Sequence, residues 1–251
     1  MAQAAVNKPK IEIVPNPESI ARRSLEIFIH AAQKAINEKG VFYIAISGGR
    51  TPKEFFELLG EAEQSKALSW DKVHLFWADE RYVSPDSELS NFRLAADTFL
   101  SKVRIPADNV YRIFTEYRDI HIAAAEYERI IKSVFIPKQN QIPQFDMIFL
   151  GLGCDGHIAS LFPDSDAVLE TKKLVTTVTD SKVKPDRVTL TSPILCAAAK
   201  VLILVSGEEK AEIVKKIFTG KPDVSTYPAY VLWPILEKVV WLIDSAAAKL
   251  L

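Results

Sequence analysis

The sequence is poor in cysteine and has no long apolar segment. Its 2 cysteines, Cys154 and Cys196, lack the CxxC spacing of metal and redox motifs, and we expect both to be reduced thiols. No apolar run approaches the roughly 20 residues that span a bilayer, and the opening MAQAAVNKPK contains no apolar core of a secretory signal. We therefore expect a cytoplasmic protein without a membrane partner.

Charge of one sign is not in excess either, because 31 lysines and arginines face 32 aspartates and glutamates. Without a basic stripe, the sequence lacks the electrostatic pattern of a nucleic-acid binder, and no nucleic-acid partner is expected. Any anionic ligand must therefore be bound by local groups.

Histidine is scarce, and the 4 residues do not have the spacing of metal ligands. His30, His74 and His121 fall in a helical pattern, a strand pattern and a helix start, without an HxxxH or His-carboxylate spacing. The G-x-S-x-G motif of a serine nucleophile does not occur. The sequence thus predicts no metal, and it leaves His157 acting on water as the simplest hydrolytic arrangement.

Short apolar runs alternate with helical patterns along the whole chain. Several of the runs are apolar at consecutive residues, which is typical of strands covered on both faces. Alternation of this kind predicts an α/β fold, with a mainly parallel open β-sheet flanked by helices on both faces in the Rossmann-like manner, in a single domain of residues 1–251. The runs are IEIV, VFYIAIS, KVHLFWA, NVYRIF, FDMIFLGL, LVTTV, RVTLTS, KVLILVS and KVVWLID, and the helical patterns cover residues 17–38, 53–66, 91–102, 121–134 and 208–218.

Two features mark the ends of elements. Gly40 follows the first helical pattern as a natural C-terminal cap. The stretch IPKQNQIPQ, around Pro137 and Pro143, is the best candidate for a long surface loop.

Ligands of open parallel sheets bind beyond the carboxyl ends of the strands, so a site is expected in the loops that follow the apolar runs. In the first, ISGGRTPKEFF, Ser47, Gly48, Gly49 and Arg50 follow a strand. Paired glycines let backbone N–H groups approach a phosphate, and a helix N-terminus adds positive potential. Thr51 could cap that helix with Pro52 at its first position. A plain strand-to-helix turn is the alternative.

In the second loop, Asp79, Glu80 and Arg81 end an apolar run. Charged groups at the end of a buried strand need partners, and Arg81 could bind a carboxylate or phosphate through two hydrogen bonds. The alternative is a structural ion pair at the edge of the sheet.

The third loop, FLGLGCDGHIASLF, spells G-x-G-x-x-G after a strand, which is also the pattern of a dinucleotide-binding turn. A helix starting near His157 would meet Pro163 after about two turns, too short for the usual crossover to the next strand. We therefore reject a dinucleotide and expect no cofactor. Asp155 and His157 can instead face one cleft, with the aspartate orienting an imidazole base. A hydrogen-bonded structural histidine is the alternative.

Several motifs occurring together resemble the 6-phosphogluconolactonases, from about residue 46 to the C-terminus. They are SGGRTP, FWADERYV with SNFRLA, LGLGCDGHIASLFPDS, KPDRVTLT, LVSGEEKA, YPA and WLIDSAAA. The resemblance implies hydrolysis of 6-phospho-D-glucono-1,5-lactone to 6-phospho-D-gluconate, the second step of the oxidative pentose phosphate pathway. The substrate is then a small sugar phosphate, and no cofactor is implied.

The resemblance also implies roles for individual residues. His157 would be the general base and Asp155 would orient it. Arg81 and Lys210 would supply cationic groups around the phosphate or the lactone oxygens. Arg187 is a further candidate, with a strand-edge ion pair as the alternative. The phosphate- and substrate-binding set is Ser47, Gly48, Gly49, Arg50, Asp79, Arg81, Lys210 and Arg187.

Two other functions stay open. Glucosamine-6-phosphate deaminases and isomerases are similar to this chain. They typically carry Asp-Glu-Tyr where this chain has Asp-Glu-Arg at residues 79–81, and Phe-Asn-Glu-Pro where it has Ser-Leu-Phe-Pro at residues 160–163. Both features favour the lactonase. A sugar-phosphate sensor without catalysis is the third possibility, and the presence of both Asp155 and His157 is against it. We expect a monomer.

Overall fold

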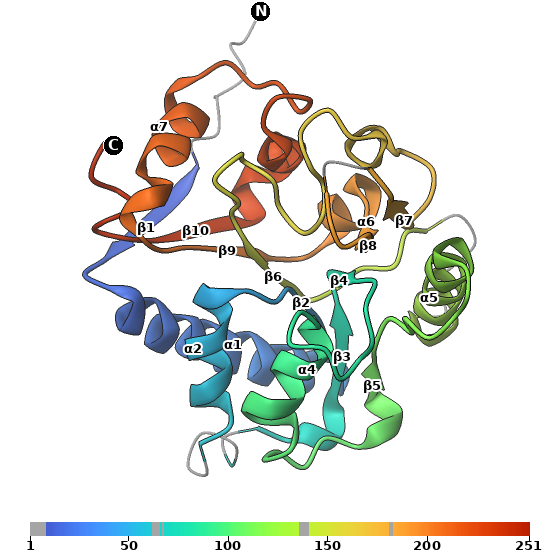
Figure 1. The fold of residues 1–251 in the computed structure, drawn as a ribbon. Helices are drawn as coiled ribbons and strands as arrows, with labels where there is room; N and C mark the ends of the chain where they lie inside the picture. Colours follow the sequence, from blue (N-terminus) through green and yellow to red (C-terminus); the bar gives the residue numbers. More distant parts are fainter. Residues whose placement is uncertain (1–8, 62–65, 67, 136–140, 181–182) are drawn as a thin grey trace, which may run out of the picture.

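The computed structural model describes residues 9–61, 66, 68–135, 141–180 and 183–251, and its central feature is a parallel sheet (Figure 1). Within these residues the sheet has 7 strands in the order β1-β10-β9-β6-β2-β3-β5, and the pairings are parallel. Each strand coincides with an apolar run of the sequence, which confirms the predicted sheet. The strands are β1 (Lys10–Val14), β10 (Val239–Asp244), β9 (Val201–Val205), β6 (Met147–Gly151), β2 (Phe42–Ile46), β3 (Val73–Trp77) and β5 (Val110–Tyr111).

A smaller antiparallel sheet of 3 strands lies beside it within the described residues: β4 (Asp79–Arg81), β8 (Arg187–Leu190) and β7 (Val175–Val178). Strand β4 is a correction to the sequence analysis, which placed its charged residues at a strand end. The chain passes from one sheet to the other at Ala78, whose N–H donates to Ile46 (2.8 Å) and whose carbonyl accepts from Leu190 (2.8 Å). The charged strand is possible because both of its carboxylates find hydrogen-bond donors.

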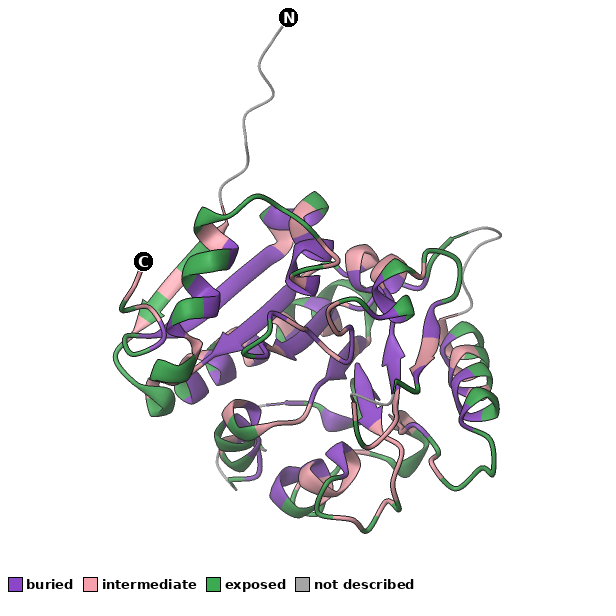
Figure 2. Ribbon diagram, turned by 45° about the horizontal axis from the view of Figure 1, so that its top comes forward, coloured by how far each residue is buried: buried purple, intermediate pink, exposed green. Residues whose placement is uncertain are grey.

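Helices cover both faces of the large sheet, as predicted (Figure 1). Helices α1 and α2 lie on one face, and α7 and η6 lie on the other. Figure 2 shows that most of the strands are buried between them and that the outer faces of the helices are exposed, while the edge strand β1 is itself largely exposed. The helices and helical turns are α1 (Pro17–Lys39), α2 (Arg50–Leu59), η1 (Trp70–Lys72), α4 (Asn91–Ala95), η2 (Ala96–Leu100), η3 (Ala107–Asn109), α5 (Ile120–Phe135), η4 (Asp166–Leu169), α6 (Ser192–Ala197), η5 (Glu208–Lys210), α7 (Ala211–Thr219) and η6 (Pro228–Lys238).

The ends of the helices confirm some predictions and correct others. Gly40 ends α1 with φ of 80° and a bond from its N–H to the carbonyl of Ile36, as predicted. Helix α2 begins at Arg50 with Gly49 as its N-cap, so the predicted cap at Thr51 is wrong. The third helical pattern consists of α4 followed by one π-helical turn, η2.

Some sequence-based expectations fall on residues without a described structure. Pro137, in the expected surface loop, lies outside the described residues, as do most of the N-terminal stretch and residues 62–65 of the second helical pattern. The described part of that helix, α2, ends at Leu59.

Aromatic packing fixes the position of α2 over the sheet. Phe55 of α2 stacks on Phe149 of β6 with 4.7 Å between ring centroids, and Phe28 of α1 lies 5.8 Å from Phe55. Buried aromatic pairs contribute about 0.5–1.5 kcal/mol beyond their hydrophobic burial. Because Phe55 lies in the second turn of α2, this packing holds the helix N-terminus, and with it residues 47–50, beside the end of β6.

Candidate active site

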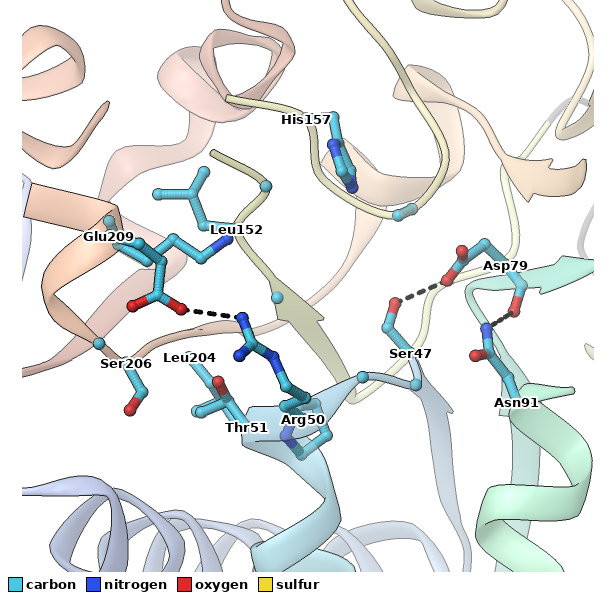
Figure 3. A pocket seen from close by; sticks show the side chains of 18 of the residues that line it. Ser47, Arg50, Thr51, Asp79, Asn91, Leu152, His157, Leu204, Ser206 and Glu209 are labelled. Carbon is cyan, nitrogen blue, oxygen red and sulfur yellow. Dashed lines mark hydrogen bonds and ion pairs between the residues drawn. The ribbon is translucent and has the colours of Figure 1, made fainter. Parts of the chain in front are cut away.

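A pocket of about 500 Å³ opens at the carboxyl ends of the parallel strands (Figure 3). The loops that follow β2, β3, β6 and β9 all contribute to its wall, as expected for an open parallel sheet. All but one of the residues predicted for the site line it: Ser47, Gly48, Gly49, Arg50, Asp79, Arg81, His157, Arg187 and Lys210. Asp155 is the exception, and it contacts the pocket through His157.

Asp155 and His157 form a hydrogen-bonded pair. The Nδ1 atom of His157 lies 2.6 Å from Oδ1 of Asp155, and the backbone N–H of His157 donates to the same oxygen at 3.1 Å. Since an ionised carboxylate can only accept, the proton lies on Nδ1, which leaves the lone pair of Nε2 available as a base. Burial raises the pKa of Asp155, but its hydrogen bonds to His157 and the imidazole charge outweigh burial, so the pKa lies below its usual value.

Gly153 and Gly156 make this pair possible. The Gly153 N–H donates to the carbonyl of His157 at 2.8 Å, and the Gly156 N–H donates to the carbonyl of Gly153 at 3.0 Å. A Cβ atom on Gly153 would lie 2.1 Å from Nδ1 of His157 and 2.5 Å from Oδ1 of Asp155. Gly156 has φ of 85°, a conformation that side chains disfavour. Because glycine has no side chain, Asp155 and His157 can lie directly against the backbone of this turn.

No helix follows this turn. Residues 157–163, all of which the structure describes, form turns and an isolated bridge between Ile158 and Leu161. A dinucleotide site needs a helix N-terminus at that point, so the structure agrees with the rejection of that interpretation. Instead, the ring of Phe162 packs 4.5 Å from the ring of His157, between centroids.

Asp79 is buried and joins two loops of the pocket. Its Oδ1 accepts from the hydroxyl of Ser47 at 3.0 Å, and its Oδ2 accepts from the hydroxyl of Ser160 at 2.7 Å. Only 5% of Asp79 is exposed. Both carboxylate oxygens therefore have hydroxyl donors, and the expected alternative of an ion pair is not what satisfies this carboxylate.

Glu80 points away from the pocket and organises the start of α4. Its two oxygens accept from the N–H groups of Arg81 (2.7 Å), Asn91 (2.7 Å) and Phe92 (2.7 Å) and from the hydroxyl of Ser90 (3.1 Å). Burial raises the pKa of Glu80, and the N–H groups of Asn91 and Phe92 oppose that change.

Asn91 connects this loop to the glycine turn and to Arg81. Its amide donates to the main-chain oxygen of Asp79 at 2.8 Å, and its Oδ1 accepts from Nη1 of Arg81 at 2.5 Å. A Cβ on Gly48 would lie 2.0 Å from that same oxygen. Sequence reasoning did not select Asn91, although the SNFRLA motif contains it, because its contacts with Asp79 and Arg81, 12 and 10 positions earlier, form only when the loop between them folds back.

The glycine turn after β2 carries free hydrogen-bond donors. Within the described residues, neither Gly48 nor Gly49 donates its N–H to an acceptor, and both lie at the N-terminus of α2. Ser47 differs, because its hydroxyl donates to Asp79 and its N–H donates to the carbonyl of Phe149 at 3.1 Å. The backbone of the two glycines, rather than the Ser47 hydroxyl, is therefore ready to receive an anion.

The four cationic side chains of the pocket have different partners. Arg50 forms an ion pair with Glu209 at 2.8 Å (Figure 3). Arg81 donates to Asn91 and to the carbonyl of Leu89 (3.0 Å), and its Nε is buried without a partner.

Arg187 and Lys210 differ from Arg50, because no carboxylate of the described residues pairs with either of them. Arg187 donates from Nε to the carbonyl of Pro185 (3.1 Å) and lies over the ring of Phe162 at 5.9 Å, and its burial lowers its pKa. The expected alternative for Arg187, a strand-edge ion pair, is therefore not present.

The described residues contain neither a metal-binding cluster nor a membrane-spanning helix. No cluster of three histidine, cysteine, aspartate or glutamate side chains is arranged to hold a metal ion. None of the described helices combines the length and apolar character needed to cross a membrane.

Comparison with known proteins gives consistent matches. The family model described as glucosamine-6-phosphate isomerases/6-phosphogluconolactonase matches residues 15–241. A 6-phosphogluconolactonase of Nostoc sp. is 36% identical over 240 residues, covering 96% of this chain and 97% of the relative. A 6-phosphogluconolactonase of Synechocystis sp. is 37% identical over 241 residues, covering 96% and 98%.

Solved structures show the same fold. The crystal structure of 6-phosphogluconolactonase from Thermotoga maritima has a TM-score of 0.80 and 33% identity, covering 95% of this chain and 100% of that one. A monomeric glucosamine-6-phosphate deaminase has a TM-score of 0.81, covering 96% and 100%, but only 22% identity. The likeness to the deaminase is therefore a likeness of fold alone.

Proposed function

The chain belongs to the glucosamine-6-phosphate isomerase/6-phosphogluconolactonase family and is a lactonase, and from that premise we propose that it hydrolyses 6-phospho-D-glucono-1,5-lactone to 6-phospho-D-gluconate with His157 as a metal-independent base. The observation that carries the proposal is the Asp155–His157 pair at the wall of a pocket that is also lined by four cationic side chains. Hydrolysis of a lactone that carries a phosphate group needs both parts, a base that activates water and cationic groups that bind the phosphate.

The chemistry follows from the pair. Nε2 of His157 takes a proton from water while the water oxygen bonds to C1 of the lactone, which gives a tetrahedral oxyanion. When that intermediate collapses, the bond between C1 and the ring oxygen breaks, and the imidazolium returns its proton to that oxygen. Asp155 is ionised throughout and stabilises the imidazolium.

The remaining polar groups divide into two tasks. The N–H groups of Gly48 and Gly49, with Arg50, would seat the phosphate at the start of α2. Arg81, Arg187 and Lys210 would surround the lactone end or the phosphate, where cations stabilise developing negative charge. An activated ester needs no covalent intermediate, so positioning and a base are enough.

Two features favour the lactonase over the related deaminase. Arg81, where deaminases typically have tyrosine, lines the pocket. Phe162 occupies the segment that in deaminases reads Phe-Asn-Glu-Pro, and it packs on His157.

The test is the rate of acid release from freshly generated lactone, with a chelator present throughout. We expect the native chain to exceed the spontaneous rate, and His157→Ala to lose roughly two to four orders of magnitude. His30→Ala is the control, because His30 is exposed on α1, outside the pocket lining. A native rate that disappears with the chelator would refute metal independence, and activity retained by His157→Ala would remove His157 as the base.

Other outcomes separate the alternatives. Ammonia release from glucosamine 6-phosphate without lactone hydrolysis would identify a deaminase. Binding of 6-phosphogluconate without turnover of either substrate would identify a sensor. The expected cytoplasmic location, monomeric state and single domain stay predictions, to be checked by localisation of a tagged chain, sedimentation and limited proteolysis.

A further inference from the structure

Three carboxylates line the pocket, those of Glu54, Asp79 and Glu209, and among the described residues Glu209 is the one that pairs with a cationic side chain of the pocket. Glu209 extends from the turn after β9 toward Arg50 at the start of α2, and Oε1 lies 2.8 Å from Nη2 of the arginine (Figure 3). The two residues are 159 positions apart in the sequence, and both line the pocket. The ion pair therefore bridges the two loops that carry Lys210 and the glycine turn.

The direction of Glu209 is set by the turn before it. Gly207 has φ of 99°, and a Cβ there would lie 2.3 Å from Oε2 of Glu209, so this carboxylate folds back over the glycine. The N–H of Gly207 is held by the carboxylate of Asp244, 3.0 Å away. The neighbouring Glu208 does not line the pocket, and it forms an ion pair with Lys249, which also lies outside the pocket lining.

Glu209 also changes the charge that a ligand meets. Arg81, Arg187 and Lys210 form no ion pair with a carboxylate of the described residues, whereas the charge of Arg50 is already compensated. A phosphate bound to the N–H groups of Gly48 and Gly49 would need the guanidinium of Arg50 and would have Glu209 beside it. Two negative groups cannot share one exposed guanidinium without repulsion.

We propose that Glu209 occupies Arg50 until a phosphate displaces it, and that Glu209 thereby sets the affinity of the pocket for phosphorylated ligands. This inference rests on the proposed function, because it takes the start of α2 to be the phosphate site. Substrate and product carry the same phosphate, so the carboxylate weakens both and favours release of the product.

The expected size of the effect is modest. Arg50 and Glu209 are exposed at 88% and 45% of their side chains, so solvent screens the pair. Exposed ion pairs contribute little, and a neighbouring like charge adds repulsion that salt also screens. Removing the charge of Glu209 should therefore tighten phosphate binding by roughly three- to tenfold at low ionic strength, and by less at high ionic strength.

The experiment measures dissociation constants of inorganic phosphate and of 6-phosphogluconate by calorimetry. The variants are Glu209→Gln, the matched control Glu208→Gln, Arg50→Gln, and the double variant of Arg50 and Glu209. Glutamine keeps the size of the side chain and removes its charge, and both glutamates lie on the surface, so the fold should be retained.

The inference predicts tighter binding in Glu209→Gln, unchanged binding in Glu208→Gln, and a much smaller effect of Glu209→Gln when Arg50 is already glutamine. Equal or weaker binding in Glu209→Gln would overturn it, as would an equal gain in Glu208→Gln. If the native chain hydrolyses the lactone and binds phosphate but Glu209→Gln changes nothing, the inference fails and the proposed function stands. If the native chain neither binds phosphate nor hydrolyses the lactone, both fail.

Discussion

Gly153→Ala should disable catalysis while leaving the fold intact. The new Cβ would lie 2.1 Å from Nδ1 of His157, whereas nonbonded carbon contacts lie at about 3.5 Å or more, so the imidazole must move by about 1 Å or more. The same atom would lie 2.5 Å from Oδ1 of Asp155. The 2.6 Å hydrogen bond between the two side chains cannot survive that movement.

The stability of Gly153→Ala should change little. Gly153 does not have a positive φ, so alanine meets no backbone strain there. The clash is with two side chains that are partly exposed, His157 at 30% and Asp155 at 47%, and both can turn toward solvent. A misplacement of about 1 Å in a catalytic group can cost roughly 10²-fold in rate, and we expect a loss of kcat of that order.

The matched control is Gly40→Ala. Gly40 has φ of 80°, and no heavy atom lies within 4 Å of the position that a Cβ would take, so alanine there adds strain of about 1–2 kcal/mol without a clash. We expect Gly40→Ala to unfold at a lower temperature, by about 2–4 °C per kcal/mol, with native kcat. Gly153→Ala should instead lose kcat and keep an unfolding temperature close to native.

The assay compares initial rates of lactone hydrolysis, corrected for the spontaneous reaction, with thermal unfolding of each variant. Calorimetric binding of 6-phosphogluconate to Gly153→Ala, with an affinity close to native, would show that the proposed phosphate site persists. A kcat within about threefold of native in a folded Gly153→Ala would refute the reasoning, because it would mean that the Asp155–His157 geometry does not limit the rate.

Two further substitutions test the roles of the carboxylates. Asp155→Asn removes the negative charge that would stabilise the imidazolium. The attraction between two such charges about 4 Å apart in a largely solvated site is about 1–2 kcal/mol, so kcat should fall roughly 5- to 30-fold in the lactone assay. An unchanged kcat would refute that role. Glu80→Ala leaves three N–H groups and one hydroxyl without their acceptor, so thermal unfolding should show a loss of about 3–5 kcal/mol, or roughly 10 °C. The exposed Glu88 in the same loop is the control, and Glu88→Ala should cost less than about 0.5 kcal/mol; similar losses in both variants would refute the role of Glu80.

The parts of the fold that depend on local pattern were predictable from the sequence. Consecutive apolar residues specify buried strands, and β9, Val201–Val205, is buried at every position. The helix α1 was predictable from its apolar periodicity and from Gly40. Strand β4 was missed because Asp79–Arg81 has no apolar pattern, and its pairing with β8 depends on residues more than a hundred positions later.

The site was predictable at the level of loops but not of contacts. The glycine turns, the Asp155–His157 pair and the cations each have a local signature at the end of a strand. Asn91, Ser160 and Glu209 have none, because each acts through a partner that only the fold brings near. The partner of Ser160 is Asp79, 81 positions earlier in the chain.

The hydrogen bonds also distinguish polar groups of the pocket that already have protein partners from polar groups that are free to bind a ligand. The hydroxyl of Ser47, both carboxylate oxygens of Asp79 and the amide of Asn91 are engaged with one another and with neighbouring protein groups. Engaged groups of this kind hold loops in place and cost no reorganisation during the reaction.

Other groups around the pocket have no protein partner among the described residues. They include the N–H groups of Gly48 and Gly49, Nε of Arg81 and the ammonium of Lys210, and Nε2 of His157 carries a free lone pair because the proton lies on Nδ1. Under the proposed function, these groups supply a phosphate cradle, cations and a base around one pocket. Because hydrolysis of an activated ester needs positioning and a base, the groups left free by the fold include those that the proposed reaction requires.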